Sequence, residues 1–138
     1  MADGAQLSSA VMFVRDLDVS ASFYRDLLLL AEVDRSPTAI LLLSGGGAQL
    51  ILRAMGANVS HTLGGIGMQY VIWTASGPDD LARCEAVLHQ RSAYYESRKC
   101  EGAEAVEGRD PDGIPVIVVY PGPDQLPLHE LPSRIYGW

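Results

Sequence analysis

The sequence predicts an α+β fold built from two tandem β-α-β-β-β modules, about residues 7–56 and 65–120, with an extended tail over residues 121–138. An apolar, β-rich run followed by a helix-like pattern occurs twice, about 59 residues apart. Short apolar runs separated by turn sequences follow each helix-like pattern. The 138 residues, of which 48% are hydrophobic, suffice to bury the core of a single domain.

The first module opens with an apolar run at residues 8–14, which predicts a strand that ends in the polar turn 15–18. A helix is expected next, capped by Ser20 or Asp18, because such side chains accept backbone N–H groups at a helix start. The apolar positions of this helix recur at near-helical spacing as far as Ala31: Phe23, Leu27, Leu28 and Leu30.

Three short strands are expected to complete the first module. The run 32–35 precedes Pro37 and predicts the first of them. The runs 39–43 and 49–52 predict a hairpin, because the glycines at 45–47 between them readily supply the positive φ of a tight turn.

The second module repeats this order. The run 68–73 predicts a strand, and residues 76–80 predict a helix start with proline at an early position. The helix should continue over 81–90, with four residues on one buried face: Leu81, Cys84, Val87 and Leu88.

Two further strands are expected at residues 103–107 and 116–120, and the sequence Asp-Pro-Asp-Gly at 110–113 predicts the turn before the second of them. The tail over 121–138 contains four prolines, so it should run extended and contain no helix.

The charge balance excludes several classes of partner. Ten Lys and Arg against 17 Asp and Glu give a net charge of −7, which repels nucleic acid and anionic membranes. No apolar run approaches the roughly 18 residues of a membrane-spanning helix. The first residues lack the basic and apolar regions of a secretory signal, so a cytoplasmic protein is expected.

Two motifs resemble those of a known family. Residues 13–28, Phe-Val-Arg-Asp-Leu-Asp-Val-Ser-Ala-Ser-Phe-Tyr-Arg-Asp-Leu-Leu, are similar to the strand, turn and helix that open the vicinal oxygen chelate superfamily. Gly-Arg-Asp-Pro-Asp-Gly at 108–113 resembles the turn before its last strand. The superfamily holds glyoxalase I, extradiol dioxygenases, fosfomycin-resistance enzymes and bleomycin-resistance proteins. The resemblance implies that both modules form a curved half-open barrel.

The resemblance also implies where a metal ion would be held, and the residues there do not suit one. The first strands of the two modules place Ser9 and Met68 at ligand positions, or Gln69 if the second strand is shifted by one residue. Ile117 stands where the family has a Glu. These side chains bind divalent ions poorly, so no metal is expected. The three histidines, His61, His89 and His129, show no metal-binding spacing.

Other cofactors and covalent chemistry have no sequence support either. The sequence contains no G-x-S-x-G nucleophile motif. The glycines at 45–47 and 64–67 both lead into predicted strands, whereas phosphate and dinucleotide loops precede helices. We therefore expect no cofactor.

The residues that alternate with the three ligand positions predict an apolar, aromatic and uncharged lining. The lining residues of the candidate ligand site are Ser9, Phe13, Met68, Tyr70, Ile117 and Val119, and in the same strands also Val11 and Ile72. Ser9, Tyr70 and His61 could orient a ligand through hydrogen bonds. Trp138 could pack over a crevice or onto a partner subunit. The alternative is that the apolar positions simply fill the core.

A metal-free barrel with such a lining resembles the bleomycin-resistance branch, whose members are dimers that sequester an antibiotic without chemistry. The resemblance implies a homodimer that binds a hydrophobic or aromatic small molecule. Because the inferred lining is uncharged, a planar aromatic natural product fits better than cationic bleomycin. The alternatives are a metal-independent isomerase, cyclase or lyase with Tyr70 or His61 as acid or base, and an inactive scaffold with a filled cavity.

Overall fold

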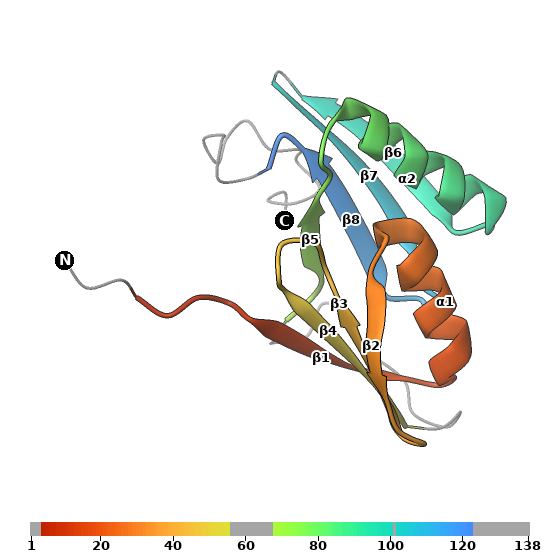
Figure 1. Ribbon diagram of the computed structural model, residues 1–138. Helices are drawn as coiled ribbons and strands as arrows, with labels where there is room; N and C mark the ends of the chain where they lie inside the picture. Colours follow the sequence, from red (N-terminus) through yellow and green to blue (C-terminus); the bar gives the residue numbers. More distant parts are fainter. Residues whose placement is uncertain (1–3, 56–67, 101, 123–138) are drawn as a thin grey trace. The chain divides into compact units, whose positions relative to one another are not determined.

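The computed structural model describes residues 4–55, 68–100 and 102–122 (Figure 1). The chain divides into two compact units, Met1–Ser60 and His61–Trp138. Within the described residues, each unit contains one helix and one open four-stranded sheet of mixed direction. The predicted α+β class and the two β-α-β-β-β modules are confirmed, whereas the half-open barrel and the homodimer stay predictions.

The first unit has its elements in the predicted order. They are β1 (Ser9–Val14), α1 (Leu17–Leu28), β2 (Ala31–Arg35), β3 (Ala39–Leu43) and β4 (Gln49–Ala54). The strand order is β1-β4-β3-β2; β1 runs parallel to β4, and the other neighbours are antiparallel. Gly47 has a φ of +94° in the turn between β3 and β4, as the hairpin prediction requires.

The core of the first unit lies between α1 and one face of its sheet. The largest fully buried side chains on the two layers are Tyr24 and Leu27 on α1, Ile40 and Leu42 on β3, and Leu50 and Leu52 on β4. Met12 pairs with Leu52 and therefore shares this face. Ser9, Val11 and Phe13 alternate with it and lie on the face that α1 does not cover.

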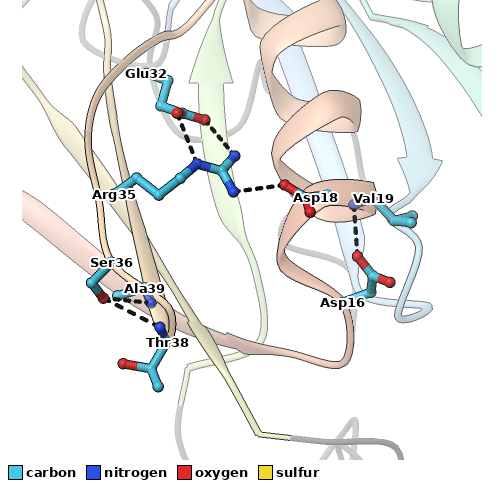
Figure 2. A network of polar contacts seen from close by, with 8 residues as sticks. All are labelled: Asp16, Asp18, Val19, Glu32, Arg35, Ser36, Thr38 and Ala39. Atoms are coloured by element: carbon cyan, nitrogen blue, oxygen red, sulfur yellow. Dashed lines mark hydrogen bonds and ion pairs between the residues drawn. The ribbon is translucent and has the colours of Figure 1, made fainter.

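Helix α1 begins earlier than predicted, so the expected caps Ser20 and Asp18 are wrong. Asp16 is the N-cap, and its Oδ1 accepts the N–H of Val19 at 3.0 Å (Figure 2). Ser20 lies inside the helix and is buried. Asp16 directly precedes the helix and has the extended backbone typical of an N-cap, which leaves its carboxylate beside the first turn.

The carboxylate of Asp18 instead anchors the edge strand β2. Nη1 of Arg35 donates to Oδ1 of Asp18 at 2.7 Å, and Nη2 of Arg35 donates to Oε1 of Glu32 at 2.9 Å (Figure 2). All five residues of β2 are exposed. Charged side chains on an edge strand discourage pairing with other chains.

The second unit also follows the predicted order, with one strand for which no bounds were predicted and one shortened strand. Its elements are β5 (Val71–Thr74), α2 (Pro78–Gln90), β6 (Tyr94–Cys100), β7 (Ala103–Arg109) and β8 (Pro115–Tyr120). The strand order is β5-β8-β7-β6, with β5 parallel to β8. The predicted strand 68–73 begins only at Val71, which pairs with Val116. The residue before Val116 on β8 is Pro115, which has no N–H to extend the ladder between β5 and β8.

Helix α2 covers one face of the second sheet and brings its buried side chains Leu81, Cys84 and Leu88 onto it. The approach is closest at Gly108 of β7, where an added Cβ would lie 2.4 Å from Cδ2 of Leu88. Gly108 pairs with Val116 of β8, so both lie on the face that α2 covers.

The turn between β7 and β8 forms as predicted. Oδ1 of Asp110 accepts the N–H groups of Asp112 and Ile114 at 2.8 and 2.9 Å. Its carbonyl accepts the N–H of Gly113, whose φ is +82°. No helix within residues 4–55, 68–100 and 102–122 is long and apolar enough to cross a membrane.

Candidate functional site

The face of the second sheet opposite α2 carries an apolar patch. Ala105, Ile117 and Val119 form a buried cluster, and the partly buried Tyr70 and Ile72 pack against it. In the ladders, Ile72 pairs with Ile117, and Ala105 pairs with Val119. Residues in register on neighbouring strands point to the same face, which therefore differs from the face of Gly108. We call these five residues the apolar patch.

The structure brings three predicted site residues together in this patch: Tyr70, Ile117 and Val119. Ile117 is only 2% exposed and Val119 is fully buried, so these two also fill the core. Met68 is 73% exposed and precedes β5, so strand alternation does not place it on this face.

Two other predicted site residues lie in the first unit. Ser9 and Phe13 are on the face of the first sheet that α1 leaves uncovered, and Phe13 is 56% exposed there. His61 and Trp138 lie outside the described residues. A ligand-binding role for all of these residues stays a prediction.

The position of the implied metal ligand on β8 does not fit a divalent ion. Ile117 offers no donor atom, and the carboxylate nearest in the ladder belongs to its partner Glu107 on β7. Oε2 of Glu107 already accepts a hydrogen bond from Nη1 of Arg109. Among the described residues, no three His, Cys, Asp or Glu side chains gather closely enough to hold a metal ion.

A charged group beside the apolar patch corrects the expectation of an uncharged lining. Glu107 is only 3% exposed and faces the same side as Ile117. Arg109 follows two residues later on β7, and its guanidinium lies 4.0 Å from the ring centroid of Tyr95 on β6. Nη1 of Arg109 also donates to the carbonyl of Gly108 at 3.3 Å.

A second ion pair extends this charged group along β6. Glu96 pairs with Glu107 in the ladder, and Nε of Arg98 donates to Oε1 of Glu96 at 3.1 Å. Two carboxylates directly across an antiparallel ladder repel each other unless each has a cation nearby. Arg98 and Arg109 supply those two cations.

The neighbouring tyrosines Tyr94 and Tyr95 have different environments because a bulge interrupts the ladder between Tyr94 and Glu96. The ring of Tyr94 stacks on His89 of α2 with 4.0 Å between centroids, whereas the Tyr95 ring contacts Arg109. The two tyrosine rings therefore lie on different faces of the sheet: Tyr94 on the face that α2 covers and Tyr95 on the face of the apolar patch.

Sequence reasoning missed Glu107 and Arg109 as site residues. The alternation of Ala105, Glu107 and Arg109 was visible in the sequence and places the three on one face of a strand. Which face this is depends on the pairing of Glu107 with Ile117. That pairing is long-range, so no local signal identifies the charged group as a neighbour of the apolar patch.

Comparison with models of known protein families and with curated proteins finds no match. Solved structures do match. A glyoxylase/bleomycin resistance protein/dioxygenase domain from Frankia sp. EAN1pec has a TM-score of 0.73 and 21% identity, over 85% of this chain and 98% of that one. Lactoylglutathione lyase from Agrobacterium tumefaciens has a TM-score of 0.65 and 21% identity, over 85% and 94%.

Oxidase ChaP-H2 has a TM-score of 0.68 and 18% identity, over 83% of this chain and 92% of its own. The similar structures thus include proteins named as resistance protein, lyase and oxidase, and what they share with this chain is the architecture. The chain has the two-module fold of the glyoxalase/bleomycin resistance/dioxygenase proteins, which is the fold of the vicinal oxygen chelate superfamily.

Proposed function

We propose that this protein is a metal-independent binding protein that sequesters a hydrophobic, aromatic small molecule without changing it. The observation that carries the proposal is the apolar residue Ile117, which packs with Tyr70 and Ile72 where the superfamily resemblance implies a metal-binding carboxylate. Such a surface gains free energy by removing apolar ligand area from water, at roughly 25 cal/mol per Å². It offers no open coordination position for a substrate oxygen.

The finer parts of the proposal are that the ligand is an antibiotic, that binding confers resistance, and that the protein is a cytoplasmic homodimer. Their support is the resemblance to the bleomycin-resistance branch. Tyr70 in the apolar patch and Tyr95 near its charged edge favour a flat aromatic ligand, because each aromatic pair adds about 0.5–1.5 kcal/mol beyond buried area.

The test is non-denaturing mass spectrometry of the full chain purified without chelator. A metal-free dimer that carries a few hundred daltons of organic mass supports sequestration and yields the ligand for identification. Extraction and mass measurement of that compound after long incubation should return it unchanged. A stoichiometric divalent ion in the spectrum contradicts the proposal.

A second candidate function is a metal-independent isomerase, cyclase or lyase at the same face. The buried carboxylate of Glu107 next to the apolar patch favours it, because a positioned carboxylate can move a proton. Tyr70 is the other candidate acid or base. This candidate predicts a changed ligand mass, and it predicts that Tyr70→Phe or Glu107→Gln stops the change while the compound still binds.

A further inference from the structure

Arg109 holds unused hydrogen-bond donors at the edge of the apolar patch. A guanidinium has five N–H groups. Nη1 of Arg109 donates to the Glu107 carboxylate and to the Gly108 carbonyl. Among the residues that the structure describes, Nε and Nη2 of Arg109 have no hydrogen-bond partner. These two nitrogens share one edge of the guanidinium and form a fork that matches two oxygens.

This fork is held in place before any ligand arrives. The Glu107 carboxylate fixes one side of the guanidinium, and the Tyr95 ring lies against its face at 4.0 Å. Burial of Glu107 shields its carboxylate from water and strengthens its attraction for the partly exposed Arg109. Such preorganisation lowers the entropy lost when a ligand binds.

The fork also lies close to the apolar patch. Glu107 pairs directly with Ile117, and Arg109 is the next residue of β7 on the same face. A flat ligand on Tyr70 and Ile72 would therefore have the Arg109 guanidinium close to one of its edges. The apolar patch and the charged guanidinium of Arg109 therefore lie side by side within the second unit.

We propose that Arg109 recognises a two-oxygen anionic group, such as a carboxylate, on a planar aromatic ligand that lies on the apolar patch. This inference rests on the proposed binding function and specifies the chemical class of the ligand. Glu107 acts as a positioning residue, since it holds Arg109 and partly neutralises its charge.

Because the protein has a negative net charge, a preference for an anionic ligand would indicate a local interaction. With 17 acidic and 10 basic side chains, the overall field attracts cations and repels anions. A preference for an anionic ligand must therefore come from a local donor. It should also persist when added salt screens the long-range field.

The experiment uses three fluorescent probes that share one ring system and one attachment position: naphthoate, naphthylmethanol and naphthylmethylammonium. We expect the full-length protein to bind naphthoate about tenfold more tightly than naphthylmethanol, because charge-assisted hydrogen bonds are strong. The ammonium probe should bind most weakly. In Arg109→Gln, naphthoate should bind only as well as naphthylmethanol, whose own affinity should stay within about twofold.

Two control variants separate the local effect from general ones. Arg25→Gln removes the same charge from the exposed side of α1 and should leave all three affinities unchanged. Tyr70→Ala should weaken the three probes by similar factors because it removes part of the patch. If Arg109→Gln is poorly folded because Glu107 loses its partner, the double variant Arg109→Gln/Glu107→Gln removes both charges.

The single variant Glu107→Gln distinguishes the positioning role of Glu107 from a purely structural one, which would leave the ligand preference unchanged. Removing its negative charge should raise the preference for naphthoate over naphthylmethanol. Equal affinities of the folded wild-type protein for naphthoate and naphthylmethanol would overturn the role of Arg109 and leave the proposed binding function standing. A preference for naphthoate that persists in Arg109→Gln and in Arg109→Gln/Glu107→Gln would also overturn the role of Arg109 and leave the proposed binding function standing. Absence of saturable binding for every probe would contradict the proposed function itself.

Discussion

Gly108 lies on β7 where α2 approaches the sheet most closely, and replacing it with alanine tests this packing. An added Cβ would lie 2.4 and 3.0 Å from the two methyl carbons of Leu88. It would also lie 2.8 Å from the carbonyl oxygen of Ala93. Leu88 is fully buried, and the Ala93 carbonyl accepts the N–H of Arg109 at 2.8 Å. Neither neighbour can move without loss.

The cost of Gly108→Ala follows from these two contacts. Overpacking a well-packed core costs about 1–3 kcal/mol. Displacing the Ala93 carbonyl weakens a backbone hydrogen bond, which contributes about 1 kcal/mol. We therefore expect Gly108→Ala to lower the free energy of unfolding by about 3 kcal/mol and Tm by roughly 10 °C.

The measurement is urea unfolding followed by far-ultraviolet circular dichroism, with Gly46→Ala as the matched control. Gly46 lies in an exposed turn, and an added Cβ there would lie 4.0 Å from Oγ of Ser44. The free energy of unfolding of Gly46→Ala should therefore stay within about 0.5 kcal/mol of the wild-type value. In a Leu88→Ala background, the cost of Gly108→Ala should fall by about half, because only the Ala93 contact remains. Equal unfolding midpoints for Gly108→Ala and Gly46→Ala would refute the close approach of α2 to β7.

Three further predictions concern helix ends. Asp16→Ala should destabilise the protein by about 1 kcal/mol in thermal unfolding because it removes the cap of α1. Asp18→Ala loses only an exposed ion pair and should cost less than about 0.5 kcal/mol, so equal losses would contradict the cap assignment. Leu29 has a φ of +55° and is 65% exposed, so Leu29→Gly should raise stability by about 1 kcal/mol, and a lower Tm would disprove strain there. A hydrogen bond from the Ser76 backbone N–H holds the pKa of Asp80 below its ordinary 3.8. The stability from Asp80 is therefore present at neutral pH and lost as pH falls through the lowered pKa, and urea unfolding of Asp80→Asn across that range should show a deficit that disappears in acid.

Elements with strong local signals could be predicted closely. β3 (Ala39–Leu43) matches its predicted bounds because an apolar run ends at a glycine turn on one side. α2 (Pro78–Gln90) begins at the proline that the sequence singles out, since proline fits the first turn of a helix. The Asp110 turn formed because its side chain satisfies two backbone N–H groups locally.

Elements that depend on distant partners could not be predicted as well. β6 (Tyr94–Cys100) has a polar sequence without an apolar run, and it is a strand because β7 supplies its hydrogen bonds. The start of β5 depends on where Pro115 ends the ladder on β8. The N-cap of α1 depends on where β1 ends, which its pairing with β4 determines.

The sequence by itself determined the two β-α-β-β-β modules, the turns between their strands and the apolar character of Tyr70, Ile117 and Val119. All of these depend on residue spacing or on backbone conformation within a few positions. Only the tertiary structure placed Glu107 and Arg109 beside Ile117, because the register between β7 and β8 is formed by hydrogen bonds between separate strands. A shift of one residue in that register would move both charged side chains to the face covered by α2.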